Sequence, residues 1–197
     1  MPRFTSTIVK CLLVLLALLP GFALAHEGHS STGFAFGLAH PLGGLDHLLA
    51  MVAVGFWAAH LGGQARWQLP LVFVVAMVLG GTLGITGLAA PLLLVATEPM
   101  VLASSVVIGV LLASSGRISL AVAAPSCASF AVFHGLAHGS EMPMGSSAIG
   151  YALGFAMATV ALHGVGLVAG LGVRFIPGIH RLAGGFITLC GLALVAT

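Results

Sequence analysis

A short histidine-containing segment combines side chains that bind metal ions with residues that interrupt helices. It reads His-Pro-Leu-Gly-Gly-Leu-Asp-His from His40 to His47. The two histidines are seven residues apart and therefore lie nearly on one face of a helix, with Asp46 beside the second. Pro41 removes a backbone donor and the glycines add flexibility, so we expect a kinked or locally unwound helix. Discontinuous helices in membrane transporters form ion sites at such breaks.

A second segment runs from Phe133 to Glu141 and reads Phe-His-Gly-Leu-Ala-His-Gly-Ser-Glu. His134, His138 and Glu141 are spaced i, i+4 and i+7, which places them on one stripe of a helix. Two imidazoles at i and i+4 can hold one metal ion, as in the zinc motif His-Glu-x-x-His. The glutamate of that motif is absent here, so the segment lacks its general base for peptide hydrolysis.

Four further residues are weaker candidates for contact with a metal ion. His163 falls inside an apolar stretch, where it is a deeper ligand, a gate or only a packing residue. Glu98 is predicted to open a helix just before Pro99, where the helix dipole alone favours a carboxylate. His26 and His29 lie near the start of the predicted mature chain. They either capture metal outside the membrane or belong to a disordered leader.

The two main clusters also allow a purely structural interpretation. Asp46 could cap a helix that is broken at the two glycines, and the histidines could be hydrogen-bonded packing residues. Against this, ionisable groups are costly inside a bilayer, so each needs a partner, a cavity or a function. The clusters therefore favour a metal site.

The composition predicts that these clusters lie inside a membrane. Of the 197 residues, 59% are hydrophobic and only 5% are charged, and the mean hydropathy is +1.19. Soluble domains are about one quarter charged, so this chain has too few charges to cover a surface in water. Its net charge of +2 comes from a few scattered groups, which excludes a basic face for nucleic acid.

The predicted organisation is a signal peptide at 1–25, a histidine-containing periplasmic N-terminus at 26–33 and a transmembrane domain at 34–197. A helix needs about 20 apolar residues to cross a bilayer. The stretches that qualify are 34–60, 68–88, 98–115, 118–139, 145–171 and 176–196. We therefore predict an all-α, polytopic membrane protein, a six-transmembrane-helix bundle that follows a cleaved signal peptide.

The arginines predict how these spans are oriented. Arg66, Arg117, Arg174 and Arg181 fall in the first, third and fifth connections, whereas the outer connections contain no Lys or Arg. Basic connections stay in the cytoplasm, so both mature termini are predicted to be periplasmic, with the chain in the bacterial inner membrane. Both histidine clusters then begin about 9 Å below the outer surface, because a helix rises 1.5 Å per residue.

With both clusters identified, the chain resembles the HupE/UreJ family of small nickel and cobalt permeases, which are associated with hydrogenase and urease maturation. The resemblance extends from His26 to the last span and rests on 40–47 and 133–141. Glu98 and the stretch from 158 to 163 are also similar to the family pattern. The resemblance implies inward transport of Ni²⁺ or Co²⁺ as cargo, without a cofactor, through the first- and fourth-span motifs.

Two other functions stay open from the residues. One is an intramembrane metal hydrolase, in which zinc sits on the same histidines and Asp46 or Glu141 activates water. The other is a metal-binding sensor or accessory protein that does not transport. Imidazole and carboxylate ligands suit nickel, cobalt, zinc and copper alike. The oligomeric state has no signature in the sequence.

Overall fold

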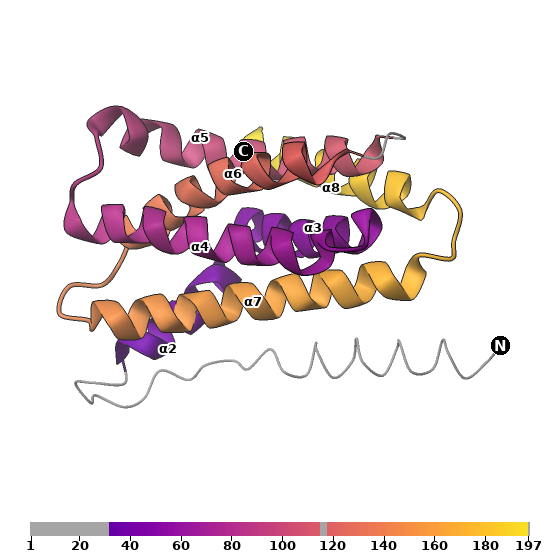
Figure 1. Ribbon diagram of the computed structural model, residues 1–197. Coiled ribbons are helices and arrows are strands. Elements are labelled where there is room, and N and C mark those ends of the chain that lie inside the picture. The colour runs from indigo at the N-terminus through magenta and orange to yellow at the C-terminus, as the bar shows by residue number, and fades with distance from the viewer. Residues whose placement is uncertain (1–31, 115–117, 197) are drawn as a thin grey trace.

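The computed structural model describes residues 32–114 and 118–196, which form a bundle of seven helices without a strand (Figure 1). The helices are α2 (Thr32–Gly43), α3 (Leu45–Leu61), α4 (Ala65–Thr86), α5 (Pro91–Ala113), α6 (Leu120–Ser140), α7 (Ala148–Val173) and α8 (Ile179–Val195). The predicted all-α class is confirmed for these residues. The predicted signal peptide, His26, His29 and Arg117 lie outside the described residues.

The apolar helices have the lengths expected of membrane spans. Within the described residues, α4, α5, α6 and α7 are each long and apolar enough to cross a bilayer. The bent pair α2 and α3 makes a fifth candidate, whereas α8, at the predicted sixth span, has only 17 residues. Large apolar side chains are exposed along these helices, as a lipid-facing surface requires. The chain is therefore a multi-pass membrane protein.

The first predicted span is broken into two helices. The axes of α2 and α3 differ by 85°, and Gly44 between them has an extended backbone (φ −107°, ψ 121°). The break comes directly after the Pro41 to Gly43 stretch, so the predicted interruption of this helix is confirmed. A Cβ on Gly44 would lie 2.7 Å from Asp46 Oδ1 and 3.0 Å from His47 Nδ1. Glycine at 44 thus leaves room for both side chains.

The start of α5 corrects the sequence interpretation of Glu98. The helix begins at Pro91, so the prediction that Glu98 opens it is wrong. Proline at the first helical position loses no hydrogen bond and already has a helical φ, which explains the earlier start. Glu98 lies inside the helix, which continues through Pro99. The dipole of a helix acts mainly on its first turn. It therefore does not explain why a carboxylate is present at position 98.

Glycines allow the helices to pack in close pairs. α4 packs on α6, α7 packs along α2 and α3, and α5 packs on α8. A Cβ on Gly135 of α6 would collide with the backbone of Met77 and Gly81 in α4. A Cβ on Gly55 of α3 would likewise collide with the carbonyl of His163 in α7. Such backbone contact is how small residues hold membrane helices together.

The helix α3 lies at the centre of the bundle. It contacts α4, α5, α7 and α8, and its side chains Met51, Val54 and Trp57 are buried. His47 is in the first turn of this central helix. The break at Gly44 therefore brings a histidine into the interior, beside the end of α6.

Candidate metal site

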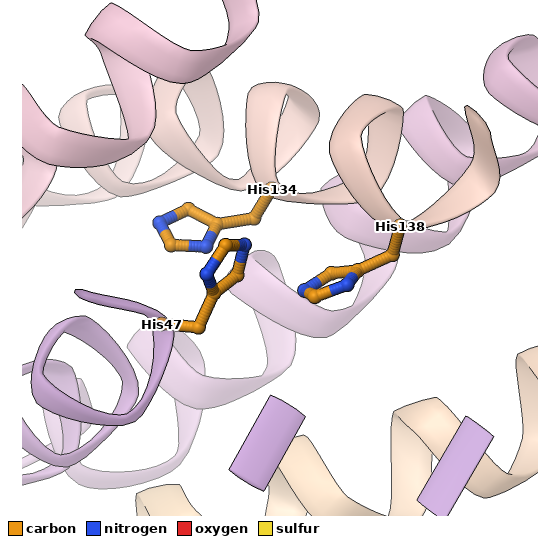
Figure 2. A group of neighbouring side chains, drawn as sticks. All are labelled: His47, His134 and His138. Atoms are coloured by element: carbon orange, nitrogen blue, oxygen red, sulfur yellow. The ribbon is translucent and has the colours of Figure 1, made fainter. Parts of the chain in front are cut away.

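Three histidines from two helices face one another inside the bundle (Figure 2). His47 comes from the first turn of α3, and His134 and His138 come from successive turns of α6. One ring nitrogen of each lies within 4.8 Å of those of the other two. Figure 2 shows the ring of His47 directed toward the two rings of α6. Its centroid is 4.9 Å from that of His134 and 4.3 Å from that of His138. The structure thus brings the two sequence clusters together.

Several nitrogens of this three-histidine group have no hydrogen-bond partner among the described residues. They are Nε2 of His47, Nδ1 of His134 and both ring nitrogens of His138. The His134 and His138 side chains are buried, at 0% and 2% exposure. Buried polar atoms in proteins are nearly always paired, so a cluster of unpaired ones needs an explanation. A first-row divalent metal ion, for which imidazole is a good ligand, would provide it.

The opposite ring nitrogens of two of these histidines are held by other side chains. His47 Nδ1 lies 2.9 Å from Asp46 Oδ1 and donates to this carboxylate, which can only accept when ionised. His134 Nε2 lies 3.0 Å from Ser104 Oγ. The Ser104 hydroxyl donates to the Val101 carbonyl and therefore accepts from His134. Because the opposite nitrogen of each ring carries the proton, His47 Nε2 and His134 Nδ1 keep a lone pair. Histidines that bind metal ions commonly donate their other ring N–H in this way.

A second group lies next to the first and shares a member with it. His40, His138 and Glu141 offer ligand atoms within 4.8 Å of one another. His40 Nε2 is 2.8 Å from Glu141 Oε2, and their side chains are 33% and 58% exposed. The ring of His138 is 4.7 Å from that of His40 and 4.3 Å from that of His47. We call these residues the outer group; His138 joins it to the buried three-histidine group.

An open pocket of about 560 Å³ leads to both groups. Its lining includes Asp46, Glu98 and Glu141, which are the acidic residues of the described ranges, together with His47. Glu98, a weak candidate by sequence, therefore shares a cavity with the main clusters. A cleft with negative charge attracts and concentrates cations.

The sequence comparisons identify the family. The model of the HupE/UreJ protein family matches residues 13–194, a range that contains both histidine clusters. The chain belongs to the HupE/UreJ family. Protein HupE of Rhizobium leguminosarum bv. viciae is 45% identical over 182 residues, covering 90% of this chain and 92% of that protein. No solved structure matches the chain. The resemblance inferred from the two histidine segments is confirmed.

His163 belongs to neither ligand group of this HupE/UreJ protein. It is buried at 1% exposure, and neither of its ring nitrogens has a partner among the described residues. The ring of Phe73 lies between His163 and the three-histidine group. Its centroid is 5.0 Å from that of His163 and 5.5 Å from that of His134. His163 is therefore separated from the three-histidine group by about one aromatic ring.

Two features of this HupE/UreJ site were not readable from the segments alone. Asp46, which the sequence predicts as a metal ligand, contacts His47 Nδ1 through its carboxylate and is not a member of the two groups described above. Ser104, which the sequence interpretation missed, makes the corresponding contact with His134. The only signal for it was a pair of serines, Ser104 and Ser105, in an apolar span.

Proposed function

We propose that this chain is a secondary permease that takes up a divalent transition metal ion, Ni²⁺ or Co²⁺, across the bacterial inner membrane. The observation that carries the proposal is the three-histidine group, with its buried and unpaired nitrogens, beside an acidic pocket that His47 lines. Imidazole nitrogens suit nickel and cobalt, and the ion is cargo, not a cofactor. Following the family resemblance, the imported metal would serve hydrogenase or urease maturation.

Charge supports six spans with the acidic pocket facing the periplasm. The arginines Arg66 and Arg174 lie at the end of the bundle where α4 begins and α7 ends. The carboxylates line the pocket at the opposite end. Because basic ends of membrane helices stay in the cytoplasm, the pocket would open outward, with α8 as the sixth span and both termini periplasmic.

The shared histidine suggests how an ion would move inward. His26 and His29 would capture the ion. It would then enter between the carboxylates of the pocket and bind the outer group first. His138 belongs to both groups, so the ion would pass to the buried group by exchanging ligands around one imidazole. From the three-histidine group the ion would move past the ring of Phe73 to His163. A potential of 100 mV, negative inside, supplies about 4.6 kcal/mol for a divalent ion moving inward.

The hydrolase alternative is weaker on this geometry. A hydrolase needs a carboxylate free to activate a metal-bound water. Asp46 is bonded to His47, and Glu141 is bonded to His40. Both carboxylates thus contact imidazoles, and neither is free in the way that a general base for a metal-bound water has to be.

The proposal is tested by uptake of radioactive Ni²⁺ or Co²⁺ into liposomes that contain the purified protein. We expect accumulation that increases when a potential, negative inside, is imposed, because two charges move inward with each ion. Protein-free liposomes are the control. Tight binding of the metal without any flux would contradict a permease and favour the sensor or accessory alternative.

Ser104→Ala is expected to weaken metal binding without unfolding the protein. The change removes the hydrogen bond that holds His134 Nε2, and loss of such a partner typically costs about 10- to 100-fold in metal affinity. The measurement is uptake rate against metal concentration. Ser129→Ala is the matched control, because Ser129 is exposed on α6 and bonds only the carbonyl of Pro125 in its own helix. Unchanged affinity in Ser104→Ala would contradict this role.

His163→Ala is expected to slow transport while leaving binding in place. His163 is outside both ligand groups, so removal should leave the affinity of the purified protein unchanged. An ion that passes Phe73 would then find no imidazole beyond it, and we expect about a tenfold lower flux, corresponding to roughly 1.4 kcal/mol on the barrier. Equilibrium dialysis and liposome uptake measure the two quantities separately. An equal loss of affinity and of flux would contradict a role for His163 in transport after the ion leaves the three-histidine group.

A further inference from the structure

A second pocket lies at the end of the bundle opposite the acidic one. Its volume is about 360 Å³, and it is formed where α3 and α7 end and where α4 and α8 begin. Its polar lining consists of His60, Arg66, Arg174 and His180. The rings of His60 and His180 stack at 4.2 Å, which fixes the end of α3 against the start of α8. This basic pocket is separate from the metal groups.

Positive charge in the basic pocket is not balanced by the described part of the chain. Asp46, Glu98 and Glu141 line the acidic pocket at the other end. Neither Arg66 nor Arg174 forms a salt bridge with any of them. The guanidinium of Arg174 lies over the ring of Phe175, 4.7 Å from its centroid. Two arginines facing one cavity are suited to a phosphate, which guanidinium groups bind in a bidentate manner.

We propose that the basic pocket binds a phosphate group, carried by an anionic lipid of the cytoplasmic leaflet. Basic pockets between membrane helices on the cytoplasmic side recognise such headgroups. Apolar side chains of Phe56, Ile176 and Ile179 lie in the same lining. They offer contact to the glycerol and acyl portion of a lipid, which free phosphate lacks. The inference uses the orientation proposed above and is independent of the metal site.

Binding there would tie together helices that are distant in the sequence. Arg66 belongs to α4, and Arg174 caps the end of α7. One phosphate bridging the two arginines would hold the ends of these helices together. We therefore expect anionic lipid to raise the thermal stability of the folded protein, as any ligand specific for the native state does.

The experiment measures thermal unfolding of the full-length protein in vesicles of phosphatidylcholine alone, with added phosphatidylglycerol, or with added inorganic phosphate. We expect phosphatidylglycerol to raise the unfolding midpoint of the wild type. The double variant Arg66→Gln, Arg174→Gln should lose most of this rise. Its affinity for the lipid should fall by more than about tenfold, because two groups that form charge-assisted hydrogen bonds are removed. Arg181→Gln is the matched control, because Arg181 is exposed near the same end and does not line the pocket.

Unfolding in phosphatidylcholine alone shows whether the variants fold, and there they should match the wild type. The unfolding midpoint of the wild type could rise with inorganic phosphate but not with phosphatidylglycerol, and the double variant could lose this rise. That result would support a phosphate site but overturn the lipid as the source of the phosphate. An equal response to phosphatidylglycerol in the wild type and the double variant would overturn the site itself. So would an equal loss in Arg181→Gln, since this would indicate attraction by net charge only.

Discussion

His138→Ala is expected to abolish metal uptake at normal protein levels. His138 belongs to both the outer and the three-histidine groups, so its removal takes a ligand from each. Two donors would be left in each group, and no imidazole would connect them. The measurements are radioactive metal uptake and metal binding by the purified protein. We expect both to be lost, whereas thermal unfolding should show a folded protein.

The comparison with neighbouring variants makes this prediction specific. His40→Ala, Asp46→Ala and His47→Ala are also expected to abolish accumulation, but they affect different groups. His40→Ala disrupts only the outer group, so the purified protein should still bind metal at the three-histidine group. His138→Ala should bind at neither. Metal binding in His138→Ala that equals binding in His40→Ala would contradict the shared role, and normal uptake would contradict the site as a whole.

Gly135→Ala is expected to have the largest effect on folding. Gly135 lies between the two histidines of α6, and a methyl group there would meet the backbone of Met77 and Gly81 in α4. Backbone atoms of a neighbouring helix cannot move aside as a flexible side chain can, and overpacking typically costs about 1 to 3 kcal/mol or more. We expect a strongly lowered unfolding midpoint, with reduced protein in the membrane. Metal binding should fall as well, because α6 is displaced.

Gly185→Ala provides the matched control for Gly135→Ala. Gly185 is also inside a helix, α8, but a methyl group there would meet nothing within 4 Å. Alanine is the better helix former by about 1 kcal/mol, so this variant should be at least as stable as the wild type. Equal destabilisation by the two substitutions would show that the contact between α4 and α6 is not what requires Gly135.

This contact also explains the composition of the α6 segment. The histidines of the segment line the site, whereas Gly135 and Gly139 face the backbone of α4. One stretch of helix therefore carries two functions on two faces. The glycines set how closely α6 approaches α4, and the histidines depend on that position to reach His47 of α3.

Amino-acid sequence alone was sufficient for features that depend on local composition. Hydropathy predicted a helical membrane protein, because a bilayer leaves few alternatives for long apolar stretches. The break in the first span followed from Pro41 and the glycines after it. The histidine segments were recognisable because helical spacing places His134 and His138 on one face. These same segments identified the HupE/UreJ family.

Only the tertiary structure decided which side chains of different helices meet. In the structure, Asp46 accepts a hydrogen bond from His47, and Ser104 of α5 accepts one from His134. His138 belongs to both groups of possible metal ligands. The structure also showed that α5 begins at Pro91 and not at Glu98, because Pro91 and Pro99 are both possible helix starts and the sequence alone does not decide between them. The physical reason is that contacts between helices depend on how closely the backbones approach at glycines. That approach is a property of the packed bundle, and no single segment contains it.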